Sequence, residues 1–236
     1  MKTKHYAEKL KRHQTVSIEN FANYFVEYMD EYLPSEKKSP VLEVGSGLGN
    51  LLLVMKGFGY TNVEGYDIDD SNIDFCKKLN LNVKNIDLTQ NNKSIKKQYD
   101  LIYAFDLIEH IDKEKTIPFL KNTYNLLSEK GSIVIKTQNM QNPFNLLSRY
   151  KDFTHTVGYT PDIYRQLMDE TEISSYTIKY GDGYAVYDHS IVKRVIKFLF
   201  KVVLRILDLP LQIYYFFFLG GTWLNMQREI FLIIRK

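Results

Sequence analysis

Three glycines lie at alternate positions, Gly45, Gly47 and Gly49, directly after an apolar stretch that contains Glu43. Glycine has no Cβ atom, so it permits a sharp turn and lets a bound ligand approach the main chain closely. The fingerprint of dinucleotide-binding proteins spaces its last two glycines three apart and binds a pyrophosphate at the following helix. Here the spacing is shorter, and Glu43 would repel a phosphate and attract a cation. The pattern favours a turn that binds a small cationic ligand; the alternative is a tight turn without a ligand.

The elements that must position this turn alternate between strands and helices. Branched and aromatic residues predict strands at about residues 41–44, 63–67, 82–86, 100–105, 131–136, 175–180 and 229–234. Apolar residues at intervals of three and four predict helices at about residues 17–32, 50–56, 71–79, 113–127 and 160–168. Ser17, Ser71 and Thr160 are plausible N-caps. Strands separated by helices predict an α/β fold, with a parallel sheet covered by helices on both faces.

Acidic residues follow several of the predicted strands. Asp67 ends the strand at 63–67, 22 positions after Gly45, where a carboxylate can accept hydrogen bonds from both hydroxyls of a ribose. Asp87 follows the next strand, and Glu109-His110 follow the strand at 100–105. In open α/β sheets ligands bind beyond the carboxyl ends of the strands, so these side chains are expected at one edge of the sheet. Taken singly, Asp67 and Asp87 could also be ordinary turn residues.

Residues 41–139 as a whole resemble class I S-adenosylmethionine (SAM) methyltransferases. The segment from Glu43 to Gly49 is similar to the first motif of that family, and Tyr99-Asp-Leu-Ile with Ala-Phe-Asp-Leu-Ile-Glu-His-Ile111 is similar to its fDlI…vlEHi block. Leu127-Ser-Glu-Lys-Gly131 resembles its LkpGG turn. The resemblance implies a Rossmann-like seven-stranded sheet with an antiparallel last strand, SAM as the cofactor, and a small-molecule acceptor.

The resemblance also implies which residues hold the cofactor. Glu43 and the glycine turn would hold the methionine end, Asp67 the ribose, and Asp87 with Leu88 the adenine. The complete predicted set comprises Glu43, Gly45, Ser46, Gly47, Gly49, Asn50, Asp67, Ile68, Asp87, Leu88 and Phe105. A dehydrogenase would also supply an acid at position 67, but it has no need of the other acids or of the Glu-His pair.

Proton transfer at the acceptor points to the histidines. The methyl group of SAM is already activated by the sulfonium, so the protein must mainly align the acceptor and exclude water. A hydroxyl acceptor also needs a base with a pKa near neutrality, which favours histidine. His155 is the first catalytic candidate, with Asp152 to orient it, and His110 is the second. Alternatively, His155 only ties its loop to the next helix, and His110 serves the cofactor side or the fold.

The identity of the acceptor depends on a second resemblance. The segment Asn142-Pro…Asp152-Phe-Thr-His155…Gly158-Tyr-Thr160 resembles the acceptor loop of small-molecule and sugar O-methyltransferases. It implies a bacterial enzyme that methylates a hydroxyl or phosphate-type oxygen of a sugar, nucleotide sugar, phosphorylated intermediate or other intermediate of capsule or surface-polysaccharide biosynthesis. The alternatives are a quinone or lipid methyltransferase and a SAM-binding assembly subunit without activity.

The composition indicates a globular protein of the cytoplasm, and the apolar stretch at 191–219 adds the alternative of a location at the inner face of the membrane. Hydrophobic residues make up 44% and charged residues 25% of 236 residues. The single cysteine, Cys76, excludes an internal disulfide and suits a reducing compartment, and residues 1–8 lack the apolar region of a signal peptide. The net charge of +3 does not favour nucleic acid as a partner. No His/Asp/Glu cluster has the spacing of a metal site, so metal-independent transfer is expected.

A hydrophobic stretch separates the last two predicted strands. Lys193, Lys197, Lys201 and Arg205 recur every four residues among Val, Ile, Leu and Phe, which predicts an amphipathic helix that Pro210 ends. Such a helix suits a substrate lid, a homodimer contact through residues 191–219, or contact with a membrane surface, whereas its charges disfavour a transmembrane span. The predicted organisation is an N-terminal helical cap (1–38), a SAM-binding core (39–181), a hydrophobic helical insertion (182–227) and a final core strand (228–236).

Overall fold

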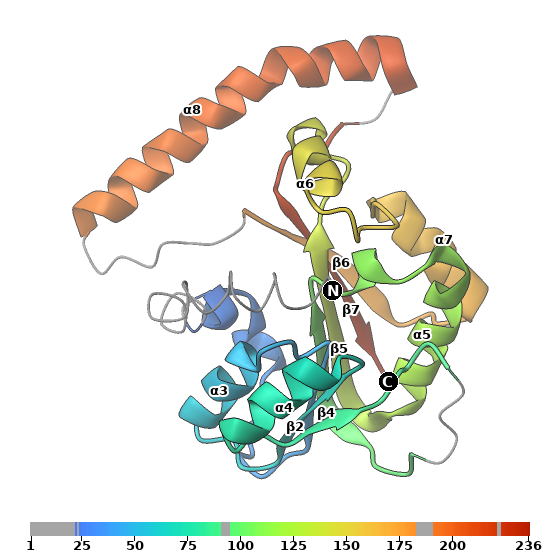
Figure 1. The fold of residues 1–236 in the computed structure, drawn as a ribbon. Coiled ribbons are helices and arrows are strands. Elements are labelled where there is room, and N and C mark those ends of the chain that lie inside the picture. Colours follow the sequence, from blue (N-terminus) through green and yellow to red (C-terminus); the bar gives the residue numbers. More distant parts are fainter. Residues whose placement is uncertain (1–21, 23, 91–94, 183–190, 221–222) are drawn as a thin grey trace.

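Seven strands form one sheet in the order β3-β2-β1-β4-β5-β7-β6 in the computed structural model of the chain (Figure 1). The structure describes residues 22, 24–90, 95–182, 191–220 and 223–236. The strands are β1 (Val41–Val44), β2 (Val63–Asp67), β3 (Val83–Asn85), β4 (Tyr99–Phe105), β5 (Leu127–Gln138), β6 (Tyr176–Gly181) and β7 (Glu229–Arg235). The first five strands pair in parallel, and β7 is antiparallel to both β5 and β6. The predicted α/β sheet with an antiparallel last strand is confirmed.

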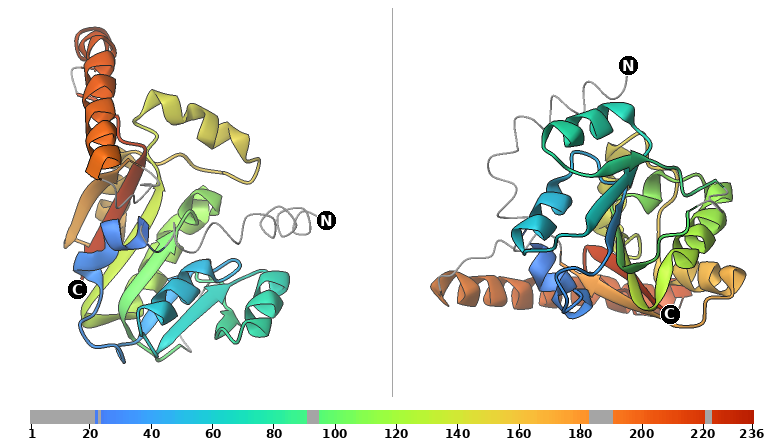
Figure 2. Two further views of the ribbon diagram at one scale, coloured as in Figure 1. Left: turned by 90° about the vertical axis from the view of Figure 1, so that its left-hand side faces the viewer. Right: turned by 90° about the horizontal axis from the view of Figure 1, so that it is seen from below.

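Helices cover both faces of this sheet (Figure 2). On one face α5 (Lys113–Asn125) and α7 (Pro161–Thr171) bury Phe119 and Tyr164 against the strands. On the other face α3 (Asn50–Gly57) and α4 (Asp70–Lys78) bury Leu52 and Cys76. The burial of Cys76 raises the pKa of its thiol to about 12, which fits a core residue and not a nucleophile. The sheet is apolar on both sides because both faces are covered.

The N-terminal helical cap is described from residue 22, and its predicted N-cap, Ser17, lies outside the described residues. Residues 24–29 are helical and run into a short 3-10 turn, η1 (Asp30–Tyr32). Phe25 and Met29 are fully buried in the same core as α3 and α4. The hydroxyl of Tyr24 donates a hydrogen bond of 2.5 Å to Glu229 at the start of β7. The cap is therefore fixed to the sheet by both apolar and polar contacts.

Several predicted element ends shift in the structure. Thr160 caps α7 as predicted, with its hydroxyl accepting from the amide of Ile163. The predicted N-cap at Ser71 is wrong, because Asp69 caps α4 and accepts from the amide of Ser71 at 2.8 Å. A carboxylate two residues earlier reaches the free amides of the first turn, so the helix begins at Asp70. β5 is longer than predicted and β3 is shorter.

The insertion between β6 and β7 is a long helix, α8 (Ile191–Tyr215), followed by a π-helical turn, η4 (Phe216–Gly220). The prediction that Pro210 ends this helix is wrong, since α8 continues through it. Proline inside a helix removes one hydrogen bond and bends the axis, but good helix formers on both sides let the helix continue. α8 is visibly bent in Figure 1. Within the described residues, no helix is both long enough and apolar enough to cross a bilayer.

Candidate functional site

The glycine turn between β1 and α3 is built from three left-handed positions. Gly45, Gly47 and Gly49 have φ angles of 74°, 49° and 77°, which side chains rarely adopt. A Cβ atom on Gly45 would lie 2.8 Å from Leu107 Cδ1, whereas one on Gly47 would meet nothing within 4 Å. Gly47 therefore presents bare main chain to open space, where a ligand can approach. Gly45 packs the turn against the segment that follows β4.

Asp67 connects the end of β2 to this turn. One of its carboxylate oxygens accepts from the amide of Gly47 at 2.7 Å, and the other accepts from the amide of Asp69 at 2.9 Å. A carboxylate oxygen has two lone pairs, so each retains capacity to accept from a hydroxyl of a ligand. Asp67 is buried, which limits its approach to ligands that enter beside Gly47. The predicted ribose contact fits this geometry.

Glu43, in β1 just before the glycine turn, has a buried carboxyl oxygen, Oε2, without a hydrogen-bond partner among the described residues. The side chain as a whole is buried. Burial, and then the neighbouring Asp67, raise the pKa of Glu43 well above its usual value. A buried carboxylate of this kind is stabilised by a cation. The orphaned oxygen and the open space at Gly47 therefore fit the ammonium group and the main body of SAM.

The other predicted cofactor residues lie around the same carboxyl edge. Ile68 is exposed after β2, Leu88 is buried, Ser46 is buried in the turn, and Asn50 begins α3. Asp87 accepts from the amide of Thr89 at 2.8 Å and from its hydroxyl at 2.7 Å, which caps its own turn. Phe105 ends β4 and packs its ring against Tyr103 and Phe25. Their contacts with adenine and methionine stay predictions.

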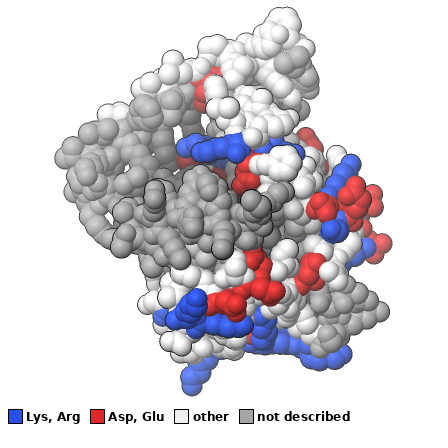
Figure 3. All heavy atoms as spheres, viewed as in Figure 1, with Lys and Arg blue, Asp and Glu red and all other residues white. Residues whose placement is uncertain are grey.

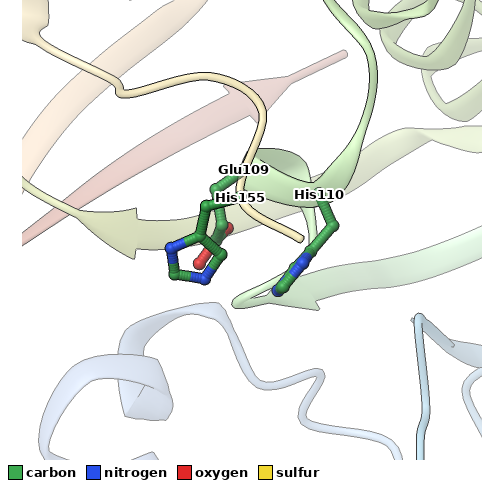
Figure 4. A group of neighbouring side chains, drawn as sticks. All are labelled: Glu109, His110 and His155. Atoms are coloured by element: carbon green, nitrogen blue, oxygen red, sulfur yellow. The ribbon is translucent and has the colours of Figure 1, made fainter. Parts of the chain in front are cut away.

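Both candidate histidines come together at the end of β4 (Figure 4). His110 belongs to the short 3-10 turn η2 (Ile108–His110), and His155 lies in the loop after α6 (Leu146–Lys151). Their ring centres are 4.6 Å apart. Thr156 holds the loop in place: its amide donates to the carbonyl of Glu109 at 2.7 Å, and its hydroxyl donates to the carbonyl of Ile111 at 2.7 Å. The two histidines are thus one site, although they are far apart in the sequence.

Glu109 is the third member of this group. Its Oε1 atom accepts from Gln138 at 3.0 Å, while its Oε2 atom and the Nδ1 atom of His155 are buried without partners among the described residues. Burial, and then Asp106, raise the pKa of Glu109 to about 7. Glu109, His110 and His155 bring their ligand-type atoms within 4.8 Å of one another, so the group could hold a metal ion. The spacing along the sequence did not predict this cluster, and metal-independent transfer stays a prediction.

The orientation of the histidines differs from the expectation for Asp152. His110 Nδ1 is 2.8 Å from the hydroxyl of Thr154, and that hydroxyl donates to Asp152 at 2.6 Å. Asp152 therefore acts on His110 through Thr154, and no direct hydrogen bond to His155 is recorded in the described part of the chain. Burial, and then His155, lower the pKa of His110. A lowered pKa keeps the imidazole neutral at neutral pH, which is the form that accepts a proton.

Sequence reasoning missed the polar residues behind Glu109. Asp106 has a φ of 51°, unusual for a residue other than glycine, and it pairs with the buried Lys136. Gln138 donates to both Asp106, at 3.2 Å, and Glu109, at 3.0 Å. The available signal was the alternation of Lys136 and Gln138 at the end of an otherwise apolar strand. Polar residues on alternate positions of a buried strand share one face and need partners there.

Comparison with known proteins places this site in a family. Residues 17–176 match a family model described as methyltransferase domain. The chain is 30% identical over 123 residues to a ubiquinone biosynthesis O-methyltransferase of Rickettsia bellii (strain OSU 85-389), covering 50% of this chain and 49% of that protein. It is 28% identical over 136 residues to a phosphoethanolamine N-methyltransferase of Plasmodium falciparum, covering 52% of this chain and 48% of that protein. The chain thus spans about half the length of these relatives.

Solved structures share the fold. A SAM-dependent methyltransferase from Archaeoglobus fulgidus superposes with a TM-score of 0.67 at 21% identity, covering 93% of this chain and 95% of that one. The plantazolicin methyltransferase BpumL, solved in complex with SAH, superposes with a TM-score of 0.55 at 19% identity, covering 94% of this chain and 83% of that one. Because the family model spans more than half of the chain and the β1–α3 turn fits the cofactor, the chain belongs to the methyltransferase domain family, the class I enzymes that use S-adenosylmethionine.

Proposed function

We propose that the chain transfers a methyl group from SAM to a hydroxyl oxygen of a small-molecule acceptor, with the histidine pair accepting the proton. The observation that carries this proposal is the convergence of His110, His155 and the buried Glu109 at the carboxyl end of β4. Gly45 packs on Leu107, two residues before Glu109, so this group adjoins the cofactor turn. When bound, SAM supplies an electrophilic methyl group on a positively charged sulfur.

The residues on the acceptor side divide the work between them. An acceptor hydroxyl beside His155 loses its proton to an imidazole nitrogen as its oxygen gains the methyl group. His110, kept neutral by burial and oriented through Thr154, lies against His155 and can receive a proton in turn. Glu109, with a pKa of about 7, stabilises an imidazolium when it is ionised. General acid–base catalysis of this kind raises the rate of a reaction by about 10²–10⁴-fold.

Two chemical classes of acceptor have support, and a third belongs in the test. A sugar, nucleotide sugar or phosphorylated intermediate of surface-polysaccharide biosynthesis is supported only by the resemblance of the 142–160 loop. A quinone or lipid acceptor is favoured by the exposed apolar side chains Leu147 and Phe153 within that segment. One curated relative is named as a ubiquinone biosynthesis enzyme, which is consistent with the second class. Another relative is named as an N-methyltransferase, so amine acceptors belong in the test.

The experiment is a transfer assay with methyl-labelled SAM and the full chain. Nucleotide sugars, phosphorylated metabolites, short-chain demethylated quinols and phosphoethanolamine are offered in parallel. With the acceptor that reacts, His155→Ala should lower kcat about 10²–10⁴-fold with little change in SAM affinity. A retained kcat in both His155→Ala and His110→Ala would refute the proton-accepting role. SAM binding without transfer to any acceptor would favour an inactive assembly subunit instead.

A further inference from the structure

Two exposed apolar elements, α6 with its flanks and α8, lie at one end of the molecule (Figure 1). On α6 and its flanks, Phe144, Leu146, Leu147, Tyr150 and Phe153 are each between 60% and 90% exposed. On α8, Val195, Leu199, Val203, Ile206, Leu207 and Ile213 are also exposed. Figures 1 and 2 show α6 and α8 projecting from the same end of the sheet. Exposed apolar area on this scale is unusual for a surface that contacts only water.

Buried asparagines join the two elements into one unit. The amide of Asn139 donates to the carbonyls of Asn225 and Gln227, both at 3.0 Å, and that of Asn142 donates to the carbonyl of Met226 at 2.7 Å. The amide of Asn145 donates to the carbonyl of Arg228 at 2.6 Å. The chain that returns from α8 is thereby fixed against the loop that leads into α6. The segment that follows α8 and the loop that precedes α6 therefore lie side by side.

The charge pattern of α8 indicates what this surface meets. Successive helical residues turn by about 100°, so Lys193, Lys197, Lys201 and Arg205 occupy positions opposite Val195 and its exposed apolar neighbours. Asp208 is the single acid of α8. A twofold dimer through the apolar face would leave these basic positions on its outer side, without an acidic partner in the second copy. An anionic surface complements them, with the apolar face inserted among acyl chains.

The end of α8 carries aromatic residues suited to the same boundary. Tyr214 stacks on Phe218 with ring centres 5.2 Å apart, and Phe216 stacks on Trp223 at 5.4 Å. Tyr and Trp prefer the level of lipid headgroups, where one end of the ring is apolar and the other is hydrated. The upper end of the molecule in Figure 3, where α6 and the C-terminal part of α8 lie, is largely uncharged among the described atoms.

We propose that α6 and α8 form a docking surface for an anionic lipid membrane. The protein lies on the bilayer through the apolar faces of these helices, and the basic positions of α8 interact with the headgroups. Each basic residue near an anionic surface contributes about fivefold in affinity. Four such residues account for about 10²–10³-fold. This inference is independent of the acceptor, because vesicle binding is measured without methyl transfer.

The test is co-sedimentation of the full chain with phosphatidylcholine vesicles, with and without phosphatidylglycerol. We expect binding only to the anionic vesicles, weakened by added salt. The variant K193E/K197E/K201E/R205E should lose binding by about 10²-fold or more. The matched control reverses four exposed lysines elsewhere, K78E/K113E/K121E/K130E, and should lose less than about tenfold. Leu147→Ser with Phe153→Ser should weaken binding to anionic vesicles while SAM affinity, the readout of folding, stays unchanged.

Three results would overturn the proposal. The first is no binding to anionic vesicles at low salt, and the second is equal loss in the control and the α8 variant, which would show a general charge effect. The third is a dimer in light scattering without lipid that Leu199→Ser and Ile206→Ser convert to monomer. That result would assign the apolar face to a second copy of the chain.

Discussion

Glu109 allows the arrangement of the candidate site to be tested without knowledge of the acceptor. Its carboxyl is buried beside two imidazoles, and its pKa is raised from 4.5 to about 7 by burial first and by Asp106 second. Because the folded pKa exceeds the unfolded one, the protonated side chain contributes stability below about pH 4.5. This contribution is lost as the pH rises through about 7. The interval between the two pKa values corresponds to at most about 3 kcal/mol at higher pH.

Glu109→Gln removes this dependence while it preserves the local contact. The amide oxygen of the new side chain can still accept from Gln138, and the amide does not ionise. The free energy of unfolding should be measured by denaturant titration between about pH 4.5 and 8.5. The free energy of unfolding of the variant minus that of wild type should therefore increase by about 2–3 kcal/mol from the low end of this pH range to the high end. Glu170→Gln on the exposed side of α7 is the control, which should run parallel to wild type.

Parallel curves for wild type and Glu109→Gln would refute the reasoning. They would mean that the Glu109 carboxyl ionises as easily in the folded chain as in the unfolded one. The unpartnered Oε2 atom would then be satisfied by contacts that hold its charge, and Glu109 would have no reason to keep a proton at neutral pH. The raised pKa of Glu109, and the proton that it keeps near neutral pH, would have to be withdrawn.

The remaining predictions concern cofactor, orientation and metal. Gly47→Val should abolish SAM binding in calorimetry while the fold persists, because its Cβ would occupy the open space of the turn at an unfavourable φ. Asp67→Ala should weaken SAM binding by about 2–4 kcal/mol, the range for charge-assisted hydrogen bonds lost at a buried site; unchanged affinity would exclude the ribose contact. Thr154→Val should lower kcat about tenfold and leave SAM affinity unchanged, since it breaks the connection from Asp152 to His110. Methyl transfer should survive exhaustive chelation; loss that zinc or magnesium restores would instead assign Glu109, His110 and His155 to a metal.

The parts of the fold that local chemistry determines could be predicted from the sequence. Periodicity located the strands and most helices, and the glycine turn identified the cofactor edge, because each depends on neighbours within a few residues. The prediction that Pro210 ends its helix was wrong because a helix can continue through a proline when good helix formers lie on both sides and nothing opposes a bend of the axis. Asp69 was not predicted as the N-cap of α4 because Asp69, Asp70 and Ser71 are all residue types that cap helices. Only the structure shows which of the three side chains accepts from the first turn.

The candidate site could be predicted only in pieces. His110 and His155 were each identified, but their pairing depends on hydrogen bonds from Thr156 to the η2 turn, across a long stretch of chain. No local pattern contains that contact. The sequence analysis named Glu109 only as part of the Glu-His pair. Its raised pKa and its place beside the histidines depend on its burial and on the hydrogen bond from Gln138, which the sequence does not show. Tertiary contacts assembled what the sequence left as separate candidates.

The two sides of the candidate site are also held in place by different contacts. The proposed cofactor side consists of strand ends and a turn with φ angles that side chains rarely adopt, and Gly45 packs this turn against Leu107. The proposed acceptor side consists of α6 and its two flanking loops. Thr156 binds the loop after α6 to the η2 region, and buried asparagines bind the loop before α6 to residues 225–228. These asparagines connect the loop that leads into α6 to the chain returning from α8, and α6 in turn leads into the loop that carries His155. A ligand that binds α6 and α8 is therefore expected to act on the loop that carries His155 more directly than on the glycine turn, which contacts this region through Leu107.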